Sequence, residues 1–202
     1  MLKSDATHEN IETLCEEAKR FQFACVCINP CWVEFAGSLL QGSPVKLCSV
    51  VGFPLGANMS EIKALEASRL VSLGTHEIDM VLNIGALKSK DYAYVSKDIK
   101  AVVEAAKQSL VKVIIETCLL NDEEKRAACL LCMESGAHFV KTSTGFSKSG
   151  ATLHDIQLMR SVVGPDFGIK ASGGISDRAF ALVLIQAGAT RIGTSKGAGM
   201  VL

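Results

Sequence analysis

The sequence has no excess of either charge, because its 202 residues include 21 lysines and arginines against 21 aspartates and glutamates. Nucleic-acid binding depends on a basic face, so the composition gives no support to that function. Long apolar runs are missing too. The longest stretches without charge, Phe21 to Val33 and Leu47 to Ser60, are too short for a membrane span. The amino end has no basic segment followed by an apolar one, so we expect no signal peptide and a cytoplasmic protein.

The sequence also lacks the ligand pattern of a metal site. Cys129 and Cys132 form a Cys-x-x-Cys pair, but no second ligand pair at a matching spacing accompanies it. We therefore expect no bound metal. Cys25, Cys27 and Cys48 lie in apolar, strand-like stretches, and Cys129 and Cys132 lie in a helical pattern. These surroundings favour buried, reduced thiols over a disulfide framework. The four histidines fall in expected helices or turns, which argues against a catalytic histidine.

Short apolar stretches alternate with longer amphipathic ones along the whole chain. The alternation predicts strand and helix units on a parallel sheet, in a single domain over residues 1–202. Glycine ends three of the helical stretches, three residues before a strand, at Gly74, Gly136 and Gly188. The expected strands are 24–29, 45–53, 77–85, 111–117, 139–144, 168–172 and 191–195. The expected helices are 7–20, 31–41, 60–73, 92–108, 122–135, 152–163 and 177–187.

A doubly wound sheet and a β/α barrel both fit this alternation. A dinucleotide site would place Gly-x-Gly-x-x-Gly directly after the first strand, and the sequence has no such motif there. Glycines gather instead after the last two expected strands, at Gly173, Gly174 and Gly193, where β/α barrels commonly bind phosphate. We therefore predict a TIM-type (β/α)8 barrel, for which the sequence supplies seven expected strands. The resemblance described below implies that the missing strand is the first.

Three expected strands contain a charge that a buried strand should avoid: Asp79, Lys141 and Lys170. If the strand faces that carry them point into the barrel, the charges converge near its catalytic end. The two lysines would then lie on neighbouring strands about 4.8 Å apart, where repulsion and burial favour a neutral amine. A neutral amine is the nucleophile that forms a Schiff base with a carbonyl. The alternative is a structural ion pair in which Asp79 holds one lysine.

Six stretches of the sequence, in family order, resemble deoxyribose-phosphate aldolases: VGFPLGAN, EIDMVLNIGALKS, VKVIIET, FVKTSTGF, IKASGGI and ATRIGTS. The resemblance implies an aldolase that needs neither metal nor cofactor. Its reaction is the reversible cleavage of 2-deoxy-D-ribose 5-phosphate to D-glyceraldehyde 3-phosphate and acetaldehyde. The implied partner is a phosphorylated sugar, and we allow for a homodimer.

The resemblance also implies roles for individual residues. Lys141 would form the Schiff base, and Lys170 would lower the pKa of the reacting amine. Asp79 would work with Lys170 and a water in proton transfer. Cys27 would lie near the site, although packing explains this thiol better. The substrate and its phosphate would bind at Thr144, Gly145, Gly173, Gly174, Gly193, Thr194 and Ser195.

Two features depart from the family pattern. Ser176 and Asp177 stand where the family has Arg-Thr, which removes a cation and adds a carboxylate near the phosphate loops. The chain also opens with MLKSDATHENIE, whereas family members begin with a strand that carries Asp-His-Thr, so we interpret the chain as a shortened aldolase. Two alternatives therefore stay open: a catalytically weak relative that mainly binds phosphorylated sugars, and a barrel aldolase with an altered substrate.

Overall fold

The seven expected strands all form and build one parallel sheet in a computed structural model, which describes residues 1–201. Each strand pairs with the next one along the chain, from β1 to β7. Most residues of β2 to β6 are buried, as their continuous apolar sequences indicate for strands covered on both faces. The strands are β1 (Cys25–Ile28), β2 (Lys46–Val51), β3 (Glu77–Val81), β4 (Leu110–Ile114), β5 (Phe139–Lys141), β6 (Gly168–Ser172) and β7 (Arg191–Gly193).

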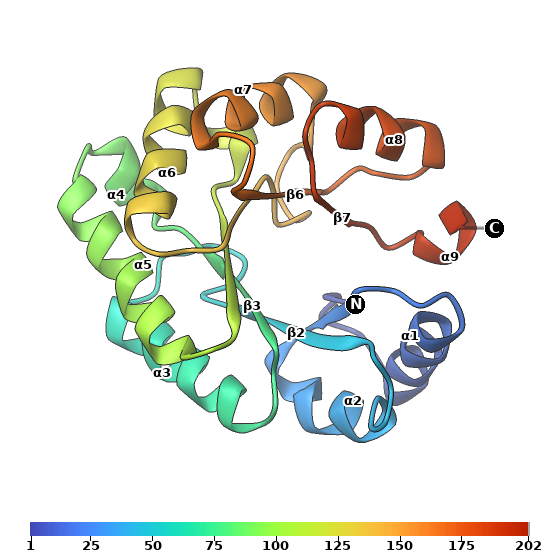
Figure 1. Ribbon diagram of the computed structural model, residues 1–202. Helices are drawn as coiled ribbons and strands as arrows, with labels where there is room; N and C mark the ends of the chain where they lie inside the picture. The colour runs from blue at the N-terminus through green and yellow to red at the C-terminus, as the bar shows by residue number, and fades with distance from the viewer. Residues whose placement is uncertain (202) are drawn as a thin grey trace.

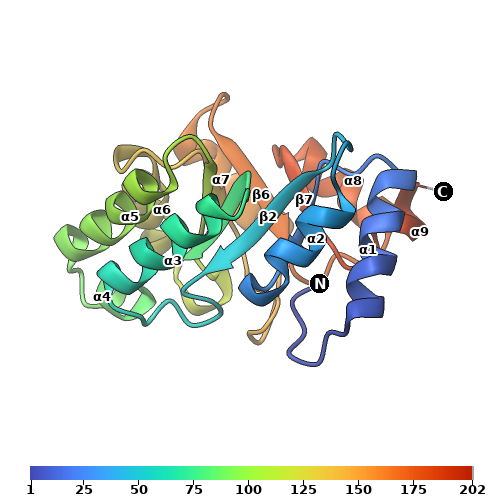
Figure 2. The ribbon, with the colours of Figure 1, turned by 90° about the horizontal axis from the view of Figure 1, so that it is seen from below.

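Helices surround the strands on the outside (Figure 1). In Figure 2, α3 to α6 lie on one side of β2 and β6, and α1, α2, α8 and α9 lie on the other. Within residues 1–201, no helix is long and apolar enough to cross a membrane. The helices are α1 (His8–Arg20), α2 (Val33–Leu39), α3 (Ser60–Ser72), α4 (Ile84–Lys88), α5 (Tyr92–Ala106), α6 (Asp122–Glu134), α7 (Leu153–Val163), α8 (Arg178–Gln186) and α9 (Gly197–Val201).

The three repeated glycines connect helices to strands as the sequence predicts. Gly74, Gly136 and Gly188 follow the ends of α3, α6 and α8, and their φ angles are 90°, 80° and 117°. A side chain would strain the backbone at these angles, so glycine allows the tight exit from the helix into the next strand. The repeat therefore reflects one structural unit used three times.

The sheet is open between its two edge strands. Within residues 1–201, β1 and β7 do not pair with each other, and no eighth strand is present. The first and last helices lie on the same side of the molecule (Figure 1). One side chain does link the edges, because Arg191 Nη1 on β7 lies 3.5 Å from Cys25 Sγ on β1. The architecture is thus the open barrel, lacking one strand, that the sequence predicts.

A buried ion pair fastens two of the outer helices to the sheet. Lys63 on α3 and Asp98 on α5 are both fully buried, with Nζ and Oδ2 2.6 Å apart. The ammonium of Lys63 also donates to the carbonyl of Val81, the last residue of β3 (3.0 Å). Since breaking one side of a buried pair is costly, this contact fixes how α3 and α5 sit against β3.

Candidate active site

One buried carboxylate gathers three lysines inside the sheet. Asp79, in the middle of β3, is fully buried. Its Oδ2 accepts hydrogen bonds from Lys141 Nζ (2.7 Å) and Lys170 Nζ (2.6 Å). Its Oδ1 accepts from Lys112 Nζ (2.8 Å). The structure therefore brings together the three charged residues that the sequence singled out, and adds a third lysine to them.

The sequence did not point to Lys112, on β4, as a site residue. It did not point to Glu77 or Arg191 either, which continue the network beyond Lys112. The ammonium of Lys112 lies 2.6 Å from Glu77 Oε2, and that carboxylate lies 3.0 Å from Arg191 Nη1. Lys112 stands in the expected strand 111–117, surrounded by valine and isoleucine. The criterion that singled out the other lysines, a charge within an apolar strand, could have found it.

The charges in this cluster stabilise one another. Burial alone would raise the pKa of the Asp79 carboxyl, but Lys141, Lys170 and Lys112 hold that pKa well below its usual range. Burial opposes the charge of Lys170, yet Asp79 raises the pKa of its ammonium. The pKa of Lys112 is raised as well, because Cys48, Asp79 and Glu77 outweigh burial. Asp79 is thus ionised, and Lys112 and Lys170 are cations.

Two thiols border the same carboxylate. Cys27 on β1 is partly buried, and its Sγ lies 3.9 Å from Asp79 Oδ2. Cys48 on β2 is fully buried, and its Sγ lies 3.3 Å from Asp79 Oδ1. Burial raises the pKa of the Cys48 thiol to about 12. The two sulfurs and the carboxylate lie within 4.8 Å of one another, as metal ligands would, but lysine ammonium groups contact both oxygens of Asp79. The thiols therefore line the site as neutral groups.

A second buried carboxylate holds the loop after β5. Thr144 donates from Oγ1 to Glu116 Oε2 (2.5 Å), and its backbone N–H donates to the same carboxylate (3.3 Å). Glu116 has a φ of 53°, in the left-handed region that non-glycine residues rarely adopt. Sequence periodicity carries no signal for this pairing, because the two residues meet only after β4 and β5 align. Glu116 fixes where the chain turns away from Lys141.

The predicted phosphate loops lie together at the carboxyl ends of β5, β6 and β7. The loop after β5 contacts the loop after β6 so closely that a Cβ added at Gly150 would lie 2.1 Å from the carbonyl oxygen of Gly173. Thr194, after β7, donates to the carbonyl of Ile175, after β6 (2.7 Å). Gly145, Gly173 and Gly174 all have positive φ angles, between 73° and 85°. The three loops therefore form one continuous rim of backbone.

The remaining residues of this rim are close to Lys170 or exposed. A Cβ added at Gly193 would lie 3.1 Å from Lys170 Cε, so glycine lets the lysine pass beside β7. Ser195 is exposed. Asp177 is also exposed and caps α8, accepting a hydrogen bond from the backbone N–H of Phe180 (2.8 Å). The carboxylate that departs from the family pattern thus occupies the amino end of α8.

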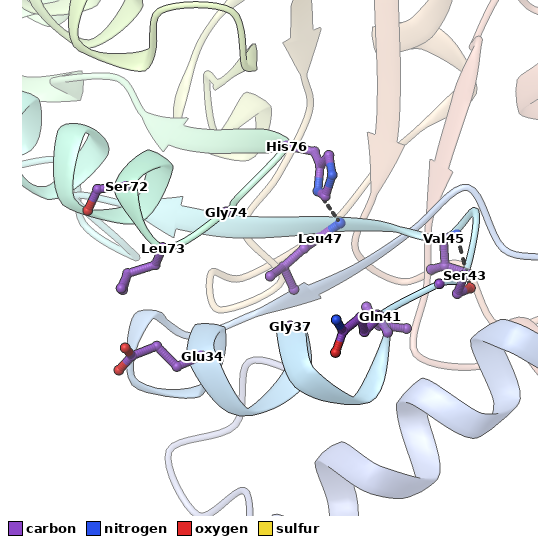
Figure 3. Close-up of a pocket in the computed structure, with 12 residues that line it drawn as sticks. Glu34, Gly37, Gln41, Ser43, Val45, Leu47, Ser72, Leu73, Gly74 and His76 are labelled. Atoms are coloured by element: carbon purple, nitrogen blue, oxygen red, sulfur yellow. Dashed lines mark hydrogen bonds between the residues drawn. The ribbon is translucent and has the colours of Figure 1, made fainter.

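A pocket of about 550 Å³ lies at the other end of the strands (Figure 3). It is lined by residues that precede or begin β2 and β3, including Val45, Leu47, Gly74 and His76. His76 Nδ1 accepts a hydrogen bond from the backbone N–H of Leu47 (3.2 Å), so this imidazole holds two strands in register. Since β/α barrels carry their chemistry at the carboxyl ends of the strands, the pocket is not part of the candidate active site.

Fold and site together define an enzyme of the β/α-barrel class that carries lysine amines around one carboxylate. The model of the family "DeoC/LacD family aldolase" matches residues 1–202. The deoxyribose-phosphate aldolase of Streptococcus sanguinis is 58% identical over 201 residues, which span 100% of this chain and 91% of that protein. The deoxyribose-phosphate aldolase of Enterococcus faecalis is 57% identical over 202 residues, with 100% and 92% covered.

A solved structure agrees with these relatives. The crystal structure of a putative deoxyribose-phosphate aldolase from Coccidioides immitis superposes with a TM-score of 0.97 at 41% identity, over 100% of this chain and 81% of that one. The chain belongs to the DeoC/LacD family of aldolases.

Proposed function

We propose that this chain cleaves 2-deoxy-D-ribose 5-phosphate reversibly to D-glyceraldehyde 3-phosphate and acetaldehyde, through a Schiff base on Lys141. The curated relatives that match the whole chain are named deoxyribose-phosphate aldolases. The observation that carries the proposal is the pairing of Lys141 and Lys170 with one oxygen of Asp79. Lys141 lies beside the cationic Lys170 on this shared oxygen, and its amine is the group that would attack the carbonyl carbon.

The reaction begins with attack of Lys141 Nζ on C1 of the open-chain sugar. Loss of water from the carbinolamine gives an iminium, which acts as the electron sink. The C3 hydroxyl then loses its proton and the C2–C3 bond breaks, with the bonding electrons moving into the iminium to form an enamine. D-Glyceraldehyde 3-phosphate leaves. Protonation of the enamine at C2 and hydrolysis of the resulting iminium release acetaldehyde and restore the lysine.

Asp79 and Lys170 are the groups that serve the proton transfers. Their side chains are already hydrogen-bonded to one another 2.6 Å apart, beside the reacting amine. A water held between them and the substrate would carry the proton to and from the enamine carbon. Ser143 lies two residues after Lys141, in the loop that follows β5, and its buried hydroxyl has no hydrogen-bond partner within residues 1–201. This hydroxyl would supply a further contact to the substrate.

The phosphate of the substrate would lie on the backbone rim that Thr144, Gly145, Gly173, Gly174, Gly193, Thr194 and Ser195 form or border. Backbone N–H groups in such turns bind anions without a charged side chain. Asp177 adds a carboxylate at the amino end of α8, beside this rim. That carboxylate favours a second candidate function, an aldolase that prefers an unphosphorylated 2-deoxy sugar.

The proposed chemistry is tested by borohydride trapping with acetaldehyde, followed by peptide mass mapping. We expect the reduced adduct on Lys141, and none in Lys141→Ala. Lys112→Met should still be labelled on Lys141, which makes it a matched control for the loss of a buried lysine. Label on Lys170, or label that survives in Lys141→Ala, would contradict the assignment. Retro-aldol turnover of phosphorylated against free deoxyribose then distinguishes the two candidate substrates.

Three expectations from the sequence remain predictions: a single domain over residues 1–202, a homodimer, and a cytoplasmic location. The homodimer can be tested by measuring the mass of the purified protein in solution.

A further inference from the structure

The network around Asp79 continues away from the reacting lysine as a ladder of alternating charges. It runs from Asp79 through Lys112 and Glu77 to Arg191, with contacts of 2.8, 2.6 and 3.0 Å. The first three side chains are 0–4% exposed, and Arg191, at the far end, is 20% exposed. We call these four residues the charge ladder.

The ladder costs more than apolar packing would. Removing charged groups from water is expensive, and a buried ion pair rarely stabilises a fold better than hydrophobic side chains of similar volume. A purely structural role therefore does not explain why Glu77 is present, since Asp79 alone already pairs with Lys112. With Glu77 present, Lys112 divides its hydrogen bonds between two carboxylates, and Oδ2 of Asp79 stays available to Lys141 and Lys170.

We propose that Glu77, anchored by Arg191, is a positioning residue that sets the pH at which the lysine amine reacts with a carbonyl. This inference rests on the proposed Schiff-base function. Glu77 contacts neither the reacting amine nor the phosphate rim, and it acts through Lys112. Its negative charge offsets the positive charge of Lys112, which would otherwise neutralise Asp79 and repel the reacting ammonium.

The other titratable groups that face the ladder come from every neighbouring strand. Cys25 on β1 contacts Arg191, and Cys48 on β2 lies 3.6 Å from Lys112 Nζ. Cys27, Lys141 and Lys170 contact Asp79, and the Met1 ammonium donates to the carbonyl of Cys27 (2.5 Å). The substitutions below leave all of these side chains in place, so each shift reports on the charge that was removed.

The sign of the effect follows from charge alone. Glu77→Gln removes a negative charge, which favours the neutral amine. The pH at which the trapping rate rises should therefore fall by about half to one unit. Lys112→Met removes a positive charge and should shift the profile to higher pH by a similar amount. When Glu77→Gln and Lys112→Met are combined, the two pH shifts should largely cancel, because a neutral pair has replaced an oppositely charged one.

The experiment measures the rate of acetaldehyde trapping by borohydride between about pH 5.5 and 10 in the intact chain. Opposite shifts in the single variants, and their cancellation in the double variant, support the proposal. Asp98→Asn is the matched control, because it breaks a buried carboxylate–lysine pair of 2.6 Å outside the ladder. It should lower stability without moving the profile. If Glu77→Gln does not fold, Arg191→Met tests the electrostatic coupling from the more exposed end of the ladder. This variant removes a positive charge and keeps Glu77, so it should shift the profile to higher pH.

Two outcomes separate this proposal from the one on which it rests. If the wild-type protein forms no adduct on Lys141, the proposed function is wrong. If that adduct forms but the single variants leave the profile unmoved, or move it in the same direction, the aldolase assignment stands and the role of Glu77 is wrong.

Discussion

Replacing Asp79 with asparagine should destabilise the protein in a way that depends on pH. The substitution keeps the size of the side chain but leaves Lys112, Lys141 and Lys170 without the carboxylate they share. Removing one partner of a buried ion pair costs about 3–5 kcal/mol of unfolding free energy. We expect a loss of that size at pH 7, which is a large part of the stability of a domain of this kind.

The cost should shrink as pH rises. In the variant, one of the three lysines can relieve the repulsion by losing its proton, so its folded pKa falls below the unfolded value of about 10.4. The unfolded chain then binds one more proton, and the stability of the variant rises by about 1.4 kcal/mol per pH unit. In the wild type, Asp79 raises the pKa values of Lys112 and Lys170, so both stay protonated in both states up to about pH 9. The difference between the two proteins should therefore fall as pH rises from 7 to 9, by at most about 2.7 kcal/mol.

Urea unfolding at pH 7, 8 and 9 measures this difference. Asp177→Asn is the control, because the exposed carboxylate of Asp177 caps α8 through a backbone N–H and asparagine caps a helix equally well, so the change should be small and the same at all three pH values. A difference between wild type and Asp79→Asn that stays constant with pH would refute the reasoning, because it would mean that the lysines remain charged without their counterion.

Two further substitutions test the site. Lys170→Met removes one of the two amines that share Asp79 Oδ2, so the remaining ion pair should tighten and acetaldehyde trapping should require a higher pH; an unchanged profile would count against this coupling. Ser176→Arg adds a cation beside the phosphate rim and should lower KM for 2-deoxy-D-ribose 5-phosphate several-fold while KM for free deoxyribose stays the same. An equal change in both KM values would show that the arginine acts elsewhere.

The sequence predicts the fold well because barrel strands and their helices leave local signals. Apolar runs mark the strands, and the glycines at 74, 136 and 188 mark the helix ends, so all seven strands were placed within a few residues. The lysines of β5 and β6 could be found by the same logic, since a charge in an apolar strand has to be explained. That logic also applies to Lys112, which lies between two valines in the expected strand 111–117.

The rest of the site depends on which strands become neighbours. Glu77 and Arg191 are 114 positions apart and meet across the inside of the sheet. Glu116 reaches Thr144 only because β4 and β5 are aligned with Ile114 opposite Lys141. No periodicity in the sequence encodes these pairings, because register and curvature are properties of the assembled sheet. The contacts among the loops after β5, β6 and β7 likewise depend on which strands lie side by side in the assembled sheet.

The contacts of the cationic side chains favour Lys141 as the proposed nucleophile. Arg191 cannot lose its proton at physiological pH. Lys112 donates to two carboxylates, and Lys170 is a cation because Asp79 raises the pKa of its ammonium. Lys141 is the last residue of β5, at the end of the sheet where the glycine-rich loops gather. An iminium on Lys141 would carry the same positive charge as an ammonium. Asp79 can therefore pair with the proposed covalent intermediate through the same oxygen that Lys141 already contacts.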